Sequence, residues 1–209
     1  MEVIQNSYIF LFVIIGFLIG FIVANLILNN RVNALKEIAY KDEILEVPNQ
    51  KMLFRILEKE INYCKKYFSD FTFILFDVDN FKQMNTKYGY HKSNLLLKDM
   101  ITLVKTSIRG TDLICRYQYG DEFAIFIRNT TSNIKNTLLL SERIRSKIED
   151  EDFLIRDKST KKKYVKLTVS MGIIQFSQLQ TYSLKELLYR AEFNLLRAKK
   201  KKNSLYSGE

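Results

Sequence analysis

The hydrophobic pattern of the chain begins with one long, uncharged run. Residues 8–28 contain no charged side chain and one strongly polar one, Asn25. At about 1.5 Å of rise per helical residue, this length matches a hydrocarbon core of roughly 30 Å. The run has no basic segment before it and no small-residue cleavage site. We therefore expect residues 1–28 to be an uncleaved transmembrane anchor, with a cleaved signal peptide as the alternative.

The charges around this run predict its orientation. Glu2 is the only charged side chain before it, whereas Arg31, Lys36 and Lys41 follow it closely. Because positive charge is retained on the cytoplasmic side, the rest of the chain is expected in the cytoplasm. The sequence thus predicts a single-pass protein of the cytoplasmic membrane.

The anchor is expected to continue into a polar helix within a linker at residues 29–47. Val32, Leu35 and Ala39 recur at spacings close to three and four, and the helix is predicted to reach Leu45. These positions fit a short parallel coiled-coil seam, and equally a helix that lies on its own domain. The only proline, Pro48, marks the start of a domain at 48–209.

Beyond the proline, helical and extended periodicities alternate. Apolar runs rich in β-forming residues predict strands at 71–76, 112–117, 123–128 and 163–174. Apolar residues three and four apart predict helices at 52–68, 81–88, 93–107, 133–148 and 183–201. Ser183 and Glu186 have the spacing of a capping box. The order predicts an α+β fold with helices flanking a mostly antiparallel sheet, the class of nucleotide cyclases and of the polymerase palm.

Composition changes this picture little. The formal net charge of +10 and the lysine runs at 161–163 and 199–202 invite a nucleic-acid reading. The basic residues are, however, scattered among acids, and there is no zinc-finger, RRM or KH signature. We therefore expect no nucleic-acid partner. We interpret the excess positive charge as attraction to anionic lipid and to phosphate ligands. Cys64 and Cys115 lie in apolar patterns and are expected in the core.

Two acidic motifs carry the candidate chemistry. Asp77 closes the apolar strand at 71–76, and Asp121 and Glu122 lie at the tip of the predicted hairpin. If the strands are neighbours, these three carboxylates meet in a small volume and repel one another unless a divalent cation binds there. Enzymes that act on nucleoside triphosphates hold magnesium in this way. The pattern predicts a nucleotide enzyme or its disabled relative.

Further motifs resemble the GGDEF family, the diguanylate cyclase domain, from about residue 42 to residue 199. The matching positions are Asp42, Val47-Pro48-Asn49-Gln50, Asp77-x-Asp79-x-Phe81-Lys82-x-x-Asn85, Gly89, Arg109-x-x-Asp112, Arg116, Gly120-Asp121-Glu122-Phe123, Thr168-x-Ser170-x-Gly172, Ala191 and Ala198-Lys199. The resemblance implies a homodimer in which each domain holds one GTP, and the 3′-hydroxyl of each GTP attacks the α-phosphate of the other. Cyclic di-GMP is the implied product.

The resemblance also implies roles for individual residues. Asp121 and Glu122 would be catalytic, and Mg²⁺ would be bound by Asp77, the backbone of Val78, Asp121 and Glu122. Nucleotide-binding residues would be Lys82, Asn85, Asn94, Gly120 and Lys199. Arg109 and Asp112 resemble a product-inhibition site, with a plain surface ion pair as the alternative. Taken singly, Asp79 could be a helix N-cap, Asn85 a turn residue and Asp121-Glu122 a polar hairpin tip.

The departures from the family concentrate on the nucleotide. Tyr119 replaces the first glycine of the signature, and Gln118 is an apparent extra residue that we expect to form a bulge. Asn94 replaces an aspartate that accepts two guanine hydrogen bonds, which predicts weaker guanine selectivity and admits ATP. Asn203 replaces an arginine. Three hypotheses follow: an active cyclase, a catalytically inactive nucleotide-binding or interaction module, and a basic scaffold without nucleotide.

Overall fold

The computed structural model covers the whole chain and describes residues 2–118, 120–128, 134–155, 162–177 and 182–208. Contacts divide the chain into two compact units, 1–40 and 41–209, which are described separately. The functional domain boundaries at 28 and 47 stay predictions. Tyr119 and Asn133, on which two of the predictions fall, lie outside the described residues.

The first unit is one helix, α1 (Glu2–Tyr40), which ends earlier than the predicted Leu45. Within the described part of the chain, Ile14–Val32 is the one helical stretch long and apolar enough to cross a membrane, and none of it is buried. This agrees with the predicted anchor in length and composition.

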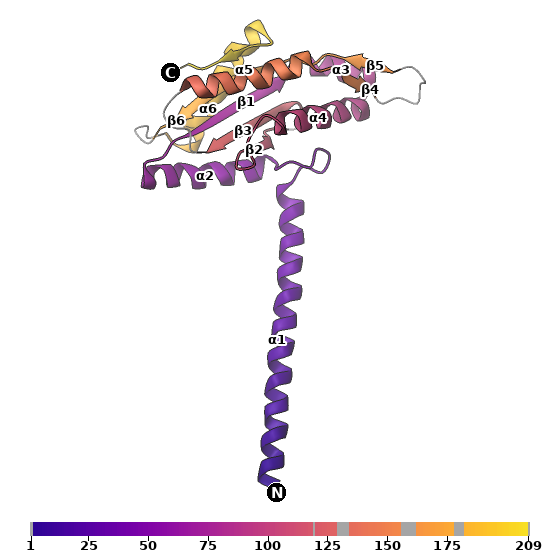
Figure 1. Cartoon of the computed structure of the whole chain (residues 1–209), viewed down its shortest axis with the longest axis vertical. Coiled ribbons are helices and arrows are strands. Elements are labelled where there is room, and N and C mark those ends of the chain that lie inside the picture. Colours follow the sequence, from indigo (N-terminus) through magenta and orange to yellow (C-terminus); the bar gives the residue numbers. More distant parts are fainter. Residues whose placement is uncertain (1, 119, 129–133, 156–161, 178–181, 209) are drawn as a thin grey trace. The chain divides into compact units, whose positions relative to one another are not determined.

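The second unit is built on a five-stranded sheet of order β2-β3-β1-β6-β7 (Figure 1). The strands are β1 (Phe71–Val78), β2 (Leu113–Arg116), β3 (Glu122–Arg128), β6 (Val169–Phe176) and β7 (Leu205–Tyr206). All neighbours are antiparallel except β6 and β7. The predicted α+β class with a mostly antiparallel sheet is confirmed. A separate pair, β4 (Phe153–Ile155) and β5 (Lys163–Val165), forms a second small sheet.

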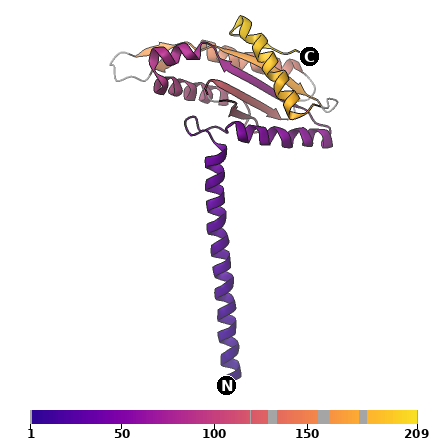
Figure 2. The same ribbon diagram turned by 180° about the vertical axis from the view of Figure 1, so that it is seen from behind.

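Helices cover both faces of the main sheet because the side chains of β1 alternate between two cores. Phe71, Phe73 and Leu75 pack with α2 (Gln50–Tyr67) and α6 (Leu184–Lys201). Ile74, Phe76 and Val78 pack with the helices of the other face. Those helices are α3 (Phe81–Tyr88), α4 (Tyr90–Lys105) and α5 (Ile134–Asp150). Figure 2 shows α6 crossing its face of the sheet.

A local sequence signal accounts for the start of α6. The Ser183 hydroxyl accepts a hydrogen bond from the Glu186 N–H at 3.2 Å. This confirms Ser183 as the N-cap of the predicted capping box. The predicted strand 163–174 is wrong as one element, since β5 and β6 belong to different sheets. Strands of two or three residues, such as β4 and β7, are too short to carry a periodic signal.

Gly172 fixes how closely α6 approaches the sheet. A Cβ added there would lie 2.3 Å from the Leu195 nitrogen and 2.5 Å from the Ala191 oxygen, which are backbone atoms of α6. Backbone cannot move aside as a flexible side chain can, so only glycine allows this packing. The contact sets the position of α6, and hence of the residues at its carboxyl end.

We expect Gly172→Ala to lower the free energy of unfolding by about 3 kcal/mol, because β6 and α6 must separate to admit the methyl group. Urea unfolding of the detergent-solubilised chain measures this change. Gly110→Ala is the matched control, since a Cβ at Gly110 meets nothing within 4 Å. Equal stability of the two variants would contradict the close packing of β6 on α6.

Candidate active site

The acidic residues of the two motifs lie at one end of the central strand. Asp77 of β1 is directly opposite Glu122 of β3 in the antiparallel ladder. The Val78 N–H donates to the Asp121 carbonyl at 3.3 Å, so Asp121 lies at the same edge. From α6, the Lys199 Nζ lies 2.7 Å from Asp77 Oδ2 and 3.6 Å from Glu122 Oε1. The structure therefore brings Asp77, Glu122 and Lys199 into contact, with Asp121 beside them.

The carboxylates are held in an environment that disfavours their charge. Burial, followed by the negative charges of Asp121 and Glu122, raises the pKa of Asp77 to about 6, although Lys199 opposes the shift. Burial also raises the pKa of Asp121, against Lys199 and Arg116. Burial alone would lower the pKa of Lys199, but its bond to Asp77 and the nearby acids raise it. A further positive charge at this edge would stabilise the ionised forms of Asp77 and Asp121.

Carboxylate oxygens are the donors that a hard divalent cation takes, so Asp77 and Glu122 fit such an ion chemically. Within the described ranges, however, no three His, Cys, Asp or Glu side chains are grouped as metal ligands. The Lys199 ammonium bridges Asp77 and Glu122 instead. The magnesium site stays a prediction, and a cation there would share these two carboxylates with Lys199 or displace it.

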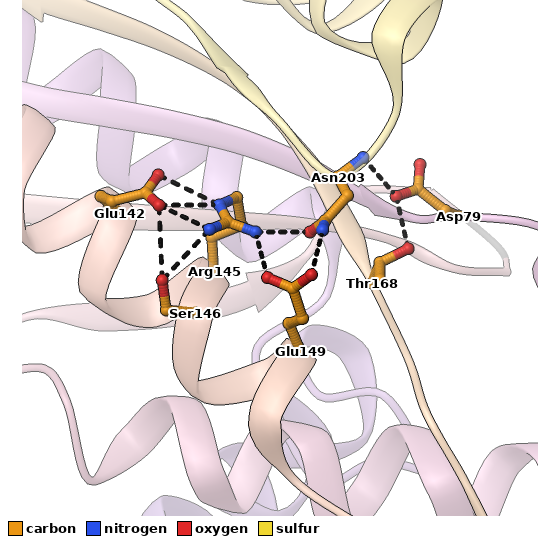
Figure 3. Close-up of polar contacts among 7 residues, drawn as sticks. All are labelled: Asp79, Glu142, Arg145, Ser146, Glu149, Thr168 and Asn203. Atoms are coloured by element: carbon orange, nitrogen blue, oxygen red, sulfur yellow. Dashed lines mark hydrogen bonds and ion pairs between the residues drawn. The ribbon is translucent and has the colours of Figure 1, made fainter.

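Asp79, the second aspartate of the motif, holds the fold together. It accepts hydrogen bonds from the Ser170 hydroxyl at 2.7 Å, the Thr168 hydroxyl at 2.8 Å and the Asn203 N–H at 2.9 Å. Asn80, not Asp79, is the residue that precedes α3. The alternative of an Asp79 helix cap is therefore wrong. Its carboxylate joins the end of β1 to β6 and to the end of α6 (Figure 3).

Asn203, at the position of the family's arginine, turns toward α5. Its Oδ1 accepts from Arg145 Nη1 at 2.7 Å, and its Nδ2 donates to Glu149 Oε1 at 2.7 Å. Arg145 also pairs with Glu142, which completes the network in Figure 3. Sequence reasoning missed this network, although acids three and four residues from Arg145 on one helix are a recognisable signal.

The lysine next to Asn203 contacts the turn after β1. Lys202 donates to Asn80 Oδ1 at 2.7 Å. Its backbone is left-handed, with φ of 58°, and its N–H donates to the Ala198 carbonyl. Lys202 thus closes α6 at the edge of the site, and a phosphate would have to compete with Asn80 for its ammonium.

A buried arginine shapes the tip of the hairpin. Arg116 donates to the Gly120 carbonyl through Nε and Nη2, and its Nη1 lies 2.7 Å from Asp42 Oδ2. Gly120 has a φ of 124°, a region that favours glycine. The ladder between β2 and β3 is regular from Leu113 to Arg116. The bulge expected near Gln118 stays a prediction.

The hairpin is also tied to α6. The Tyr117 hydroxyl donates to the Glu192 carboxylate, and the Tyr117 N–H donates to the Glu122 carbonyl at 2.9 Å. Burial, then Glu192, raises the pKa of Tyr117, which keeps this hydroxyl a donor. Neither this bond nor the Asp42–Arg116 pair was foreseen, because each joins residues far apart in sequence.

Three of the predicted nucleotide-binding residues lie on the two helices after β1. Lys82 and Asn85 are on α3, Asn94 is buried on α4, and the two helices pack together. Asn85 Oδ1 is buried and has no hydrogen-bond partner among the residues that the structure describes. An unpaired buried acceptor costs about 1–3 kcal/mol, so a donor supplied by a ligand would stabilise the site. A guanine N–H is such a donor.

Arg109 and Asp112 do not form the surface ion pair that was the simpler alternative. The Arg109 N–H donates to Asp112 Oδ2 at 2.9 Å, and the Asp112 N–H donates to the Arg109 carbonyl at 3.0 Å. Asp112 is buried and stabilises a turn, and within the described part of the chain its Oδ1 has no hydrogen-bond partner. The proposed product-inhibition role of these two residues stays a prediction.

Comparison with known proteins identifies the class. The family described as diguanylate cyclase, GGDEF domain, matches residues 39–204. The chain therefore belongs to the GGDEF family. Diguanylate cyclase DosC of Escherichia coli (strain K12) is 27% identical over 136 residues, which are 65% of this chain and 28% of DosC. Diguanylate cyclase A of Treponema denticola is 26% identical over 126 residues, which are 60% of this chain and 32% of that relative.

The chain thus spans less than a third of the length of either relative. A solved structure supports the fold. The coiled coil and GGDEF domain of DgcB from Caulobacter crescentus, in complex with c-di-GMP, has a TM-score of 0.77 at 18% identity. The match covers 87% of this chain and 92% of that structure.

We expect Asp79→Ala to reduce the free energy of unfolding by about 3 kcal/mol, since three donors to a buried carboxylate lose their acceptor. Urea unfolding measures the loss. Asp152→Ala is the control, because Asp152 forms only an exposed pair with Lys166 and should change stability by less than about 1 kcal/mol. If Asp79→Ala is as stable as the unaltered chain but inactive, Asp79 binds a ligand and does not hold the fold together.

Proposed function

We propose that the chain is a membrane-anchored diguanylate cyclase that condenses two GTP into cyclic di-GMP as a homodimer. The observation that carries the proposal is the pairing of Asp77 with Glu122 across adjacent strands, with Asp121 alongside and Lys199 between them. Buried acids of this kind are costly unless positive charge or a cation compensates them. Family membership supplies the reaction that such a site performs.

In this proposal the residues of the chain position GTP and manage charge. Asp121, whose pKa is raised by burial, accepts the proton of the attacking 3′-hydroxyl. Lys199 is about one-third exposed and turns its ammonium from Asp77 to the triphosphate. A divalent cation held by Asp77 and Glu122 would neutralise phosphate charge and orient the α-phosphate for in-line attack.

The base is read from the other side of the edge. Asn85 Oδ1, which has no hydrogen-bond partner among the described residues, accepts a guanine N–H, and the exposed Lys82, one turn earlier on α3, neutralises phosphate charge. Asn94 offers one acceptor and one donor, where an aspartate would accept twice. The proposed enzyme therefore discriminates weakly between GTP and ATP.

Dimerisation follows from the reaction, because each bound GTP is attacked by the hydroxyl of the other. The proposed anchor at Ile14–Val32 holds two copies in one membrane and raises their local concentration. The polar part of α1 that follows could then bring the two cytoplasmic domains face to face, through Val32 and Leu35, which are exposed.

The second candidate is a catalytically inactive domain that binds a nucleotide or a protein partner. Two observations favour it: Lys199 is already neutralised by Asp77, and Asn203 is committed to Arg145 and Glu149. Both reduce the positive charge available to a triphosphate. Product formation distinguishes this candidate from the cyclase.

The 209-residue chain in nanodiscs, given Mg²⁺ and GTP, should form cyclic di-GMP detected by mass spectrometry. Asp121→Ala should lower the rate by about 100-fold or more, because a positioned proton acceptor contributes at least that much. Asp152→Ala, an exposed acid outside the site, should leave it unchanged. No product from the unaltered chain at high concentration would favour the inactive candidate.

With GTP and ATP at equal concentration, the chain is expected to make mixed as well as guanine-only products. Asn94→Asp should shift the products toward cyclic di-GMP by about tenfold or more, since a charged acceptor replaces a donor facing guanine. Asn94→Ala removes the contact and should not cause this shift. If Asn94→Asp and Asn94→Ala behave alike, Asn94 does not contact the base.

A further inference from the structure

The carboxyl end of α2 carries exposed aromatic rings beside lysines. The α2 tip, as we call it, consists of Tyr63, Lys65, Lys66, Tyr67 and Phe68. Tyr63 is 48% exposed, Tyr67 55% and Phe68 77%, whereas Cys64 between them is 1% exposed and belongs to the core. Helix periodicity alone would place polar residues at such positions. The tip therefore presents apolar area to the surroundings that the core of this unit does not use.

The local geometry holds these rings outward. The rings of Tyr63 and Tyr67 lie 4.6 Å apart, and the Lys66 ammonium lies 5.0 Å from the Tyr67 ring. Phe68 ends the helix with a φ of 56°, and its N–H donates to the Cys64 carbonyl. Glycine or asparagine is usual at this left-handed position, and a phenylalanine there costs about 1 kcal/mol. Contacts within the domain do little to offset that cost for so exposed a ring.

Lysines border the rings on both sides of Cys64. Lys59, Lys65 and Lys66 are exposed on this part of α2, as is the acid Glu58, and Asp70 follows Phe68 by two residues. Glu60 is nearly buried and pairs with Arg128 at 3.3 Å. Tyrosine and phenylalanine rings beside lysines match the interface of a bilayer, where rings lie among headgroups and ammonium groups meet anionic lipid.

The position of the tip along the chain suits a membrane contact. Only residues 33–49 separate the candidate span ending at Val32 from α2. The tip directly precedes β1, whereas Asp77 lies at the other end of this strand. At about 3.3 Å per residue, the strand separates the two by roughly 25 Å. A tip in contact with lipid would leave the acidic edge in water, open to nucleotide and to a second domain.

We propose that the α2 tip is an interfacial contact with an anionic bilayer, in which Tyr67 and Phe68 enter the headgroup region while Lys65 and Lys66 bind lipid phosphates. The proposal builds on the membrane anchoring proposed above. It adds a second point of attachment, which fixes the orientation of the cytoplasmic domain and not only its distance from the membrane.

The sequence contains no tryptophan, so a single introduced one reports on its own position. Full-length Phe68→Trp in phosphatidylserine-containing nanodiscs should show blue-shifted emission that brominated lipids quench. Tyr164→Trp is the matched control, because Tyr164 is 52% exposed on β5, away from the tip. It should be neither shifted nor quenched. No quenching of Phe68→Trp, or equal quenching of both, overturns the proposal.

Charge reversal tests the lipid contact separately. Lys65→Glu with Lys66→Glu, in the Phe68→Trp background, should abolish quenching; Lys147→Glu with Lys162→Glu changes the net charge equally and should preserve it. Each lysine near an anionic surface contributes about 1 kcal/mol, so the pair corresponds to about 30-fold in occupancy. Quenching that survives the Lys65 and Lys66 change overturns the role of the lysines.

Retention of the chain in nanodiscs and its product formation are measured on the same samples. If the Phe68→Trp chain is retained and active but is not quenched, only the proposed lipid contact of the α2 tip is contradicted. If the chain is not retained in the nanodiscs, the proposed transmembrane anchor is contradicted as well as the lipid contact of the α2 tip. If Phe68→Trp is quenched while no cyclic dinucleotide forms, the tip stands and the cyclase proposal fails.

Discussion

The register of β1 between its two neighbours is the constraint on which the site depends. Asp77 is paired with Glu122 on one side and with Ser170 on the other. Because side chains alternate between faces along a strand, a slip of one residue would exchange the two cores of the sheet. Buried phenylalanines on both faces, such as Phe73 and Phe76, oppose that slip. The apolar core therefore fixes where the carboxylates meet.

Fixing acids at a buried edge has a cost, and three separate interactions offset it. Lys199 reaches over from α6 to Asp77, Asp79 receives hydrogen bonds from β6 and from the end of α6, and Arg116 holds the Gly120 carbonyl at the hairpin tip. Two of these interactions involve α6 and the third involves β2, so the edge is assembled only when the sheet and α6 are in place. Gly172 makes that possible, because it lets α6 lie directly on β6.

The sequence predicted those parts of the molecule that depend on periodicity. The strand ending in Asp77, the hairpin bearing Glu122 and the last helix with its Ser183 cap all follow from local patterns. What it could not predict were partnerships between distant residues, such as Asp42 with Arg116 or Tyr117 with Glu192. Such contacts depend on the packed fold and leave no local spacing. The hydrogen bonds of Asn203 to Arg145 and Glu149 could not be predicted for the same reason.

The residues that depart from the family pattern have different effects on the stability of the fold. Asn203 has become part of the packing, since its amide completes the network of Arg145 and Glu149, and it therefore supports the fold while giving up a positive charge at the site. Asn85 lies on α3 and Asn94 on α4, and no described residue bonds to Asn85 Oδ1. A ligand is the simplest source of the missing donor, because a buried acceptor left unpaired destabilises the fold. Base recognition by Asn85 and Asn94 stays a prediction, and the contacts of Asn203 with Arg145 and Glu149 leave less positive charge at this edge for a triphosphate.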